Sequence, residues 1–223
     1  MGSPTEPMPK IDVTRVAEKS PWKANSMLSD MRLSFSTNFT FDEILEGRRT
    51  RRTFDKVTLL ETCSFINHLF STRFVGSGEQ AGRVLKTFIS SGALHPIEII
   101  IISGPDVEEP ILFDDRKGKF VTLPVFDQLS FIEAVEEALK ILPATKGHLI
   151  LLTGDTRRLS ASYLNPVSLL WRDAGAALQA CSIAAYAYGY GFCPLGHTGS
   201  AALQALGPPH EDYVALGMAI FGR

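Results

Sequence analysis

Cysteine is scarce in this sequence of 223 residues, and so are long hydrophobic runs and charge of one sign. The three cysteines, Cys63, Cys181 and Cys193, form no CxxC motif and no Cys/His spacing. An odd number of widely separated cysteines excludes a disulfide framework and offers no zinc-ligand pattern. We therefore expect no metal site and a reduced, cytoplasmic protein.

Charge and hydropathy exclude two further classes of partner. The 22 Lys and Arg residues are offset by 24 Asp and Glu residues, for a formal net charge of -2. No overall positive charge is available to neutralise nucleic-acid phosphates. No segment reaches the roughly 18 uncharged apolar residues of a membrane span, and no signal-peptide pattern opens the chain. The sequence predicts neither nucleic acid nor membrane as a partner.

The apolar content is sufficient for one substantial core, because 45% of the residues are hydrophobic. A chain of this length suits a single domain or one half of an intertwined dimer. Residues 1–20 contain three prolines and scattered charges without periodicity, so we expect a flexible tail there. The domain itself is expected over residues 21–223.

Hydrophobic periodicity predicts an α+β fold. Apolar residues recur at helical spacing over 57–70, and residues 131–142 are also expected to be helical. Continuous apolar runs, in contrast, are typical of buried strands. Such strands are expected at 97–102 and 148–153, and a hairpin is expected from 110–113 and 119–123. Residues 213–221 are expected to form either the final strand or an arm exchanged with a partner.

Four arginines stand close together at Arg48, Arg49, Arg51 and Arg52, around Thr50. Guanidinium groups beside a hydroxyl suit a phosphate monoester, which accepts forked and single hydrogen bonds together. A solvated basic turn explains the cluster equally well when it is taken alone.

A loop of small residues, Ser90-Ser91-Gly92-Ala93-Leu94-His95-Pro96, leads directly into the apolar run 97–102. Small side chains allow the backbone to approach a flat ligand closely. An ordinary turn before a strand has the same composition, so this loop alone does not identify a site.

A long helix is expected after Asn165-Pro166, through Trp171-Arg172-Asp173-Ala174-Gly175, to a stop at Gly189 or Gly191. Small and apolar residues occupy every face of it. That pattern is typical of a helix buried on all sides, which in a chain of this size indicates the core of a dimer.

The chain resembles the flavin-dependent nitroreductase superfamily through the order of these three segments and through the sequence Gly189-Tyr190-Gly191-Phe192-Cys193-Pro194-Leu195-Gly196 that follows them. Within the superfamily it is most similar to the SagB-type, McbC-like branch. That branch includes azoline dehydrogenases of thiazole- and oxazole-modified peptides and oxidase domains of peptide synthetases. The resemblance covers roughly residues 39–217. It implies a nitroreductase-like mixed sheet flanked by helices, with a buried apolar helix and FMN at a homodimer interface.

The resemblance also implies roles for individual residues. The flavin phosphate would be bound by Arg48, Arg49 and Arg52 with the hydroxyl of Thr50, and Arg223 is a further candidate. Backbone donors near the flavin ring would stabilise the charge of the reduced cofactor. The loop against the ring corresponds to Ser90, Ser91, Gly92 and Leu94, and the loop over its other face to Pro194, Leu195 and Gly196.

One departure from the branch concerns the catalytic position. In azoline-dehydrogenating members a Lys-Tyr pair before the Arg-Asp-Ala-Gly helix is tied to proton removal, whereas this chain has Ser162 and Tyr163 there. A serine hydroxyl is a poor base without a partner. Tyr163 could act alone if a nearby arginine stabilised its phenolate, and His95 or His197 could act if either reached the pocket. A tyrosine that merely caps the core is the alternative.

The resemblance implies an FMN-dependent oxidoreductase that uses hydride transfer at flavin N5. The expected reaction is oxidation of an azoline to an azole in a peptide natural-product pathway. The substrate would be a peptide or a carrier-bound intermediate, and a synthetase or cyclodehydratase is a possible partner. Two alternatives stay open: an NAD(P)H-dependent nitro or quinone reductase, and a non-catalytic scaffold subunit of a peptide-modifying complex.

Overall fold

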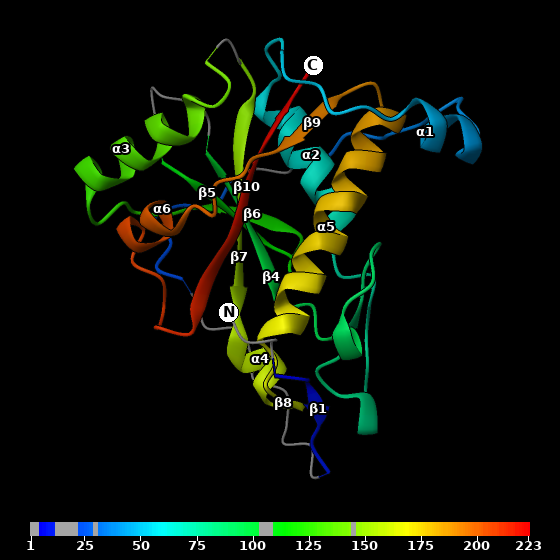
Figure 1. Cartoon of the computed structure of the whole chain (residues 1–223), viewed down its shortest axis with the longest axis vertical. Coiled ribbons are helices and arrows are strands. Elements are labelled where there is room, and N and C mark those ends of the chain that lie inside the picture. Colours follow the sequence, from blue (N-terminus) through cyan, green and yellow to red (C-terminus); the bar gives the residue numbers. More distant parts are fainter. Residues whose placement is uncertain (1–4, 12–21, 29–30, 103–108, 144–145) are drawn as a thin grey trace.

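A six-stranded sheet forms the centre of the protein (Figure 1). The computed structural model describes residues 5–11, 22–28, 31–102, 109–143 and 146–223. The strand order is β6-β5-β4-β7-β10-β9. These strands are β4 (Ile97–Ile102), β5 (Ile111–Asp114), β6 (Lys119–Thr122), β7 (His148–Asp155), β9 (Gly191–Pro194) and β10 (Tyr213–Gly222). The expected strands and hairpin are confirmed, and residues 213–221 belong to a strand of the chain's own sheet.

The sheet is antiparallel, which corrects the expectation of a mixed sheet. Each neighbouring pair of its described strands runs in opposite directions. For example, β4 pairs with β7 from Ile97 opposite Gly154 to Ile102 opposite Leu149. All six residues of β4 are buried. A strand covered on both faces has no polar alternation, and its apolar sequence therefore does not reveal its direction relative to its neighbours.

Local sequence signals set the helix boundaries. The helices are α1 (Phe41–Gly47), α2 (Leu59–Phe70), α3 (Gln128–Leu139), α4 (Thr156–Ser160), α5 (Val167–Ala187) and α6 (Ser200–Ala205). Capping boxes begin α1, at Thr40 with Glu43, and α2, at Thr58 with Glu61, and such boxes satisfy free backbone N–H groups. The helix expected at 131–142 begins three residues earlier because Asp127 caps it.

Helices cover both faces of the sheet (Figure 1). Helices α2 and α5 pack on one face, where Ile99, Ile101 and Leu152 point toward them. Helices α3 and α6 pack on the opposite face, against Ile100 and Leu151. Successive residues of a strand point to opposite faces, so the continuous isoleucine run of β4 supplies both cores at once.

Within one chain only the inner face of α5 is buried, and the expected burial of its other faces in a dimer stays a prediction. Its inner face, which includes Ala174, Ala177 and Cys181, is buried. Val167 and Trp171 are exposed on the outer face, and an added Cβ at Gly175 would meet no atom within 4 Å. Small residues on α5 allow its outer face to be buried but do not require it. Burial of that face depends on contact with a second surface.

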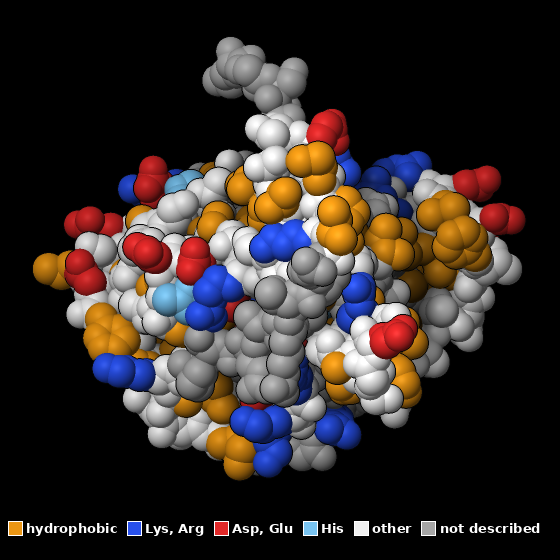
Figure 2. All heavy atoms as spheres, turned by 90° about the horizontal axis from the view of Figure 1, so that it is seen from below, with side chains coloured by type: hydrophobic (Ala, Val, Ile, Leu, Met, Phe, Trp, Pro, Cys, Tyr) orange, Lys and Arg blue, Asp and Glu red, His pale blue; other side chains and the backbone are white. Residues whose placement is uncertain are grey.

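Two short antiparallel pairs extend from the main body. Strand β1 (Met8–Pro9) pairs with β8 (Tyr163–Leu164), so part of the expected flexible tail has a partner. Strands β2 (Phe74–Val75) and β3 (Val84–Leu85) form a hairpin beside α5 (Figure 1). Figure 2 shows the end of the molecule that carries β1, β8 and α4, where hydrophobic side chains are exposed among charged ones.

None of the described helices is long and apolar enough to cross a bilayer. The boundary at residue 20 stays a prediction.

Candidate functional site

A buried carboxylate anchors the small-residue loop to α5. Asp173 is 4% exposed and accepts hydrogen bonds from the backbone N–H of Ser91 at 3.0 Å and from its hydroxyl at 2.9 Å. The Ser90 hydroxyl also donates to Asp173, and it accepts a bond from the backbone N–H of His95 at 2.9 Å. Buried charges require such partners. The two serine hydroxyls are therefore engaged within the protein, and so are the backbone N–H groups of Ser91 and His95.

The loop backbone is strained. Gly92, Ala93 and His95 have φ values of 58°, 56° and 45°, in the left-handed region that costs an L-residue about 1–2 kcal/mol. Arg158, which is 1% exposed, donates from Nε at 3.1 Å and from Nη2 at 2.7 Å to the carbonyl of Leu94. Burial lowers the pKa of this guanidinium. Strain held in place by buried contacts is common at ligand-binding sites.

A phenol and a guanidinium meet at Gly92. A Cβ added there would lie 2.9 Å from Tyr163 Oη and 3.0 Å from Arg83 Nη1. Arg83 also donates to the Gly92 carbonyl. The structure thus brings Tyr163 to the predicted loop and adds Arg83, which the sequence analysis did not identify. An isolated arginine in a polar turn carries no sequence signal for such a role.

The other candidates for proton transfer lie in different surroundings. Ser162 is 4% exposed, and its hydroxyl has no hydrogen-bond partner among the described residues. His95 is buried with its ring edge-on to Phe88, at a centroid distance of 5.3 Å. His197 accepts a bond at Nδ1 from the N–H of Gly199, and its Nε2 lies 3.8 Å from Glu137. His95 and His197 thus have packing and capping contacts in this structure.

The arginine cluster lies near the C-terminal half of α5 and beside β9. Arg48 Nη1 is 3.5 Å from the Ser182 hydroxyl. Arg49 folds back instead and donates to the carbonyls of Glu46 at 2.5 Å and of Arg48 at 2.9 Å. Thr50 and Arg52 are exposed. Among the described residues, none of the four arginines forms an ion pair with a carboxylate.

The predicted loop after β9 adjoins this cluster. Burial raises the pKa of the Cys193 thiol, and the positive charge of Arg52 opposes that rise. Pro194 and Gly196 are exposed, whereas the Leu195 N–H donates to the Met218 carbonyl at 2.8 Å. Arg51 Cδ lies 3.2 Å from the position that a Cβ on Gly191 would take, so the arginine cluster lies beside β9, the strand that leads into this loop.

Arg223 belongs to another arrangement. Its guanidinium Nε donates to Glu61 at 3.0 Å, and the Tyr190 hydroxyl donates to the same carboxylate at 3.2 Å. Burial raises the pKa of Glu61, but the hydrogen bonds from Thr58, Arg223 and Tyr190 outweigh it and lower this pKa to about 2. Arg223 thus has a carboxylate partner of its own, whereas the four arginines of the cluster have none within the described ranges.

Two groups of candidate residues thus lie along one helix. Asp173 holds the strained loop near the start of α5, and Ser182 contacts Arg48 near its end. Nine residues of helix separate them, or about 14 Å at 1.5 Å per residue. No cluster of metal-ligating side chains occurs among the residues that the structure describes. A ligand that contacted both groups would need an extended shape, with an anionic end near the arginines.

Comparison with known proteins identifies the fold. No family model and no curated protein matches the sequence. Solved structures do match, among them a candidate nitroreductase from Ralstonia eutropha JMP134, with 13% identity, a TM-score of 0.62 and coverage of 96% of this chain and 98% of that chain.

Two other matches give the same result. A candidate nitroreductase from Exiguobacterium sibiricum 255-15, solved in complex with FMN, has 15% identity, a TM-score of 0.55 and coverage of 85% and 90%. A chain of the Escherichia coli microcin synthetase McbBCD complex, solved with truncated pro-MccB17 bound, has 14% identity, a TM-score of 0.54 and coverage of 96% and 78%. At these identities the likeness concerns the fold alone. The chain has the nitroreductase-like α+β fold.

Proposed function

We propose that this chain is an FMN-dependent oxidoreductase whose site lies along α5, between the strained loop and the arginine cluster. The observation that carries the proposal is the position of these two groups on α5. The loop at Gly92 has Tyr163 and Arg83 beside it, and the arginine cluster, which has no carboxylate partner among the described residues, meets the helix about 14 Å further along its axis. Bound FMN would supply reversible hydride transfer at N5.

The residues present fit a flavin phosphate. Arg48, Arg52 and the Thr50 hydroxyl are candidates to bind it, because forked and single donors together suit a phosphate. Four neighbouring cations that have no carboxylate partner among the described residues repel one another, and a dianionic group would offset about half of their charge. Arg49 is the poorest candidate of the predicted set, since its guanidinium already donates to two backbone carbonyls.

The ring would lie against the backbone of Ser90, Ser91, Gly92 and Leu94, with Pro194, Leu195 and Gly196 on its other side. Gly92 has no side chain, and even a methyl group there would collide with Tyr163 and Arg83. Asp173 fixes the shape of this loop through its bonds with Ser90 and Ser91, and a preorganised polar environment would stabilise developing negative charge on a ring placed there.

We propose Tyr163 as the group that accepts a proton from the substrate. The Tyr163 hydroxyl and the Arg83 guanidinium both adjoin Gly92. In the oxidation of an azoline, one proton would pass to Tyr163 and one hydride to flavin N5, which leaves the aromatic azole. The fold match to a chain of the McbBCD complex supports a peptide-bound azoline and a synthetase or cyclodehydratase partner.

We further propose a homodimer formed through the outer face of α5. Val167 is 59% exposed and Trp171 44%, although both are large apolar side chains. Gly175, between them and Gln179 on the same face, leaves room for a second helix to approach closely. Burial of such a face against another copy would stabilise both chains through the hydrophobic effect.

A reductase is the second candidate function. Two of the fold matches are candidate nitroreductases, and Ser162 stands where the azoline dehydrogenases have lysine. A nitro or quinone substrate needs no carbon acid to be deprotonated, so that position would not matter for it. Reduced nicotinamide would supply the hydride to FMN in that reaction.

The absorption spectrum of the purified protein is the first test. Oxidised-flavin bands, with FMN released on denaturation, are the expected result. Anaerobic NADPH would then bleach a reductase rapidly, whereas a dehydrogenase would instead remove two hydrogens from an azoline peptide, as mass spectrometry would detect. A colourless protein that also failed to take up added FMN would refute the proposal and favour the scaffold subunit.

A further inference from the structure

The arginine cluster lies on a segment that is supported mainly at its two ends. Residues 49–53 are exposed, and their backbone groups form no hydrogen bond with another backbone group in the described ranges. Before them, the Arg48 N–H donates to the Ile44 carbonyl at 2.9 Å. After them, the Asp55 N–H donates to the Arg223 carbonyl at 2.6 Å. Contacts at the two ends therefore decide where the arginines lie.

Phe54 anchors the C-terminal end of this segment. It is 4% exposed and packs on Gly191 and Gly222, which face each other in the pairing of β9 with β10. A Cβ added at Gly191 would lie 2.7 Å from Phe54 Cε1, and one added at Gly222 would lie 2.8 Å from Phe54 Cβ. Glycine in a strand often marks such a close approach. The two glycines thus form a slot for the Phe54 ring.

Tyr186 anchors the other end from α5. Its ring stacks on Phe39 at a centroid distance of 5.6 Å, and a Cβ added at Gly47 would collide with its hydroxyl and lie 3.0 Å from its Cε1. Phe39 precedes α1 and Gly47 ends it, and α1 lies beside the C-terminal end of α5 (Figure 1). Because Gly47 is followed directly by Arg48, this contact fixes the point at which the arginines begin.

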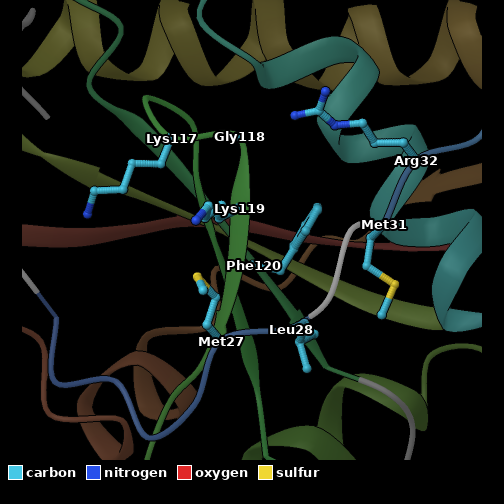
Figure 3. A pocket seen from close by; sticks show the side chains of 8 residues that line it. All are labelled: Met27, Leu28, Met31, Arg32, Lys117, Gly118, Lys119 and Phe120. Carbon is cyan, nitrogen blue, oxygen red and sulfur yellow. The ribbon is translucent and has the colours of Figure 1, made fainter.

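Another basic surface, at the turn between β5 and β6, is built differently (Figure 3). Lys117 and Lys119 lie there, and the Lys117 ammonium is 3.1 Å from the carboxylate of Asp114 in the same hairpin. The arginine cluster has no such partner in the described ranges. Its charge would therefore be offset by an anion from outside the chain.

We infer that Phe54 and Tyr186 are positioning residues of the proposed phosphate site. The two rings fix the ends of the arginine segment and so hold Arg48 and Arg52 in place for the phosphate, without touching it themselves. The inference rests on the proposed function, because the phosphate is that of FMN. A segment that is already ordered loses less conformational entropy when it binds a ligand, which favours binding.

Affinities of the full chain for FMN and riboflavin, measured by fluorescence titration, test this inference. Riboflavin has the same ring system and lacks the phosphate. Phe54→Leu combined with Tyr186→Ala should weaken FMN binding at least tenfold and riboflavin binding less than twofold. Tyr186→Phe keeps the ring and should bind FMN as the unmodified chain does. Unchanged FMN affinity in the double variant, or an equal loss for both flavins, would overturn the inference.

Phe113→Leu is the matched control. Phe113 is also buried, but it lies in β5, and its ring packs on Phe120 at a centroid distance of 4.7 Å. The substitution should lower the thermal midpoint about as much as Phe54→Leu does, because both remove part of a buried ring. It should leave both flavin affinities unchanged. A tenfold loss of FMN affinity in this control would show a general effect of destabilisation and would overturn the inference.

Limited proteolysis separates this inference from the proposed function, because it needs no flavin. Trypsin cleaves after arginine, and cleavage of a folded chain follows its local opening. The double variant should be cleaved within residues 48–53 at least fivefold faster than Phe113→Leu, with the sites identified by mass spectrometry. Equal rates would overturn the inference even if FMN binds. Failure of the unmodified chain to bind either flavin would refute the proposed function, whereas faster cleavage of the double variant would still support the two anchors.

Discussion

Replacement of Gly92 by alanine tests whether Gly92 organises the candidate site. The substitution has two separate costs. Its φ of 58° lies in the left-handed region, where an L-residue loses about 1–2 kcal/mol relative to glycine. The new methyl group would also lie 2.9 Å from Tyr163 Oη and 3.0 Å from Arg83 Nη1, and overpacking of this kind costs about 1–3 kcal/mol.

Gly78→Ala separates the two costs. Gly78 has a φ of 59°, and an added Cβ there would meet nothing within 4 Å. Both variants carry the backbone cost, but only Gly92→Ala must displace Tyr163 or Arg83. The difference in stability between them should therefore be about 1–3 kcal/mol. For a domain of this size that corresponds to a difference of roughly 2–12 °C in thermal midpoint.

Calorimetry gives the midpoints, and the rate of substrate oxidation or reduction gives the functional effect. Because a shift of about 1 Å near the chemistry can cost 10²-fold in rate, Gly92→Ala should lose at least tenfold, whereas Gly78→Ala should keep the unmodified rate. Equal thermal midpoints for the two variants, with an unchanged rate in Gly92→Ala, would refute the assignment of Gly92, Tyr163 and Arg83 to one site.

Four further predictions concern the cofactor, the loop anchor, the pH dependence and the dimer. Combined Arg48→Ala and Arg52→Ala should lower the fraction of protein that retains FMN, measured from the absorption ratio after gel filtration. Arg49→Ala should change this fraction little, because the Arg49 guanidinium bonds to nearby backbone carbonyls. Equal losses of FMN in the two proteins would contradict the phosphate assignment. Asp173→Ala would leave the Ser90 and Ser91 donors unpaired and should destabilise the fold by about 1–3 kcal/mol in denaturant titration, with the exposed Asp42→Ala as control. In the folded chain the pKa of Glu61 is lowered to about 2. Its contribution to stability is therefore complete above the unfolded pKa and is lost as the pH falls from about 5 toward 2. Glu61→Gln should flatten the decline of the thermal midpoint in that range, and an identical decline would show that Glu61 does not cause it. Gly175→Leu should convert a dimer to a monomer in light scattering, whereas Gln179→Ala should not, and a dimeric Gly175→Leu protein would place the interface elsewhere.

Most elements could be predicted from short-range patterns. Periodic apolar residues indicated α2, and the continuous isoleucine run indicated β4, because burial of one stripe or of both faces leaves a repeat within a few residues. The capping boxes at Thr40 and Thr58 are also local signals. The hairpin of β5 and β6 could be found because its turn and both strands are adjacent in the sequence.

The direction of the strands and the exposure of α5 could not be predicted. An apolar strand has the same composition in a mixed and in an antiparallel sheet, and the choice depends on how distant segments connect. Likewise, alanine and glycine on α5 are compatible with burial on every side, but Gly175 has open space beside it within one chain. The composition of a helix face shows that the face could be buried, but it does not show which other surface, if any, packs against it.

Local patterns in the sequence were enough to locate most helices and strands, the small-residue and basic loops, and the resemblance to flavin-dependent enzymes. How those segments meet depends on the packing of the folded chain. Asp173 reaches Ser90 across 83 positions of sequence, and Arg83, just before β3, and Tyr163, in β8, converge on Gly92. Such contacts depend on the packing of distant segments, and local propensity and periodicity carry no information about that packing.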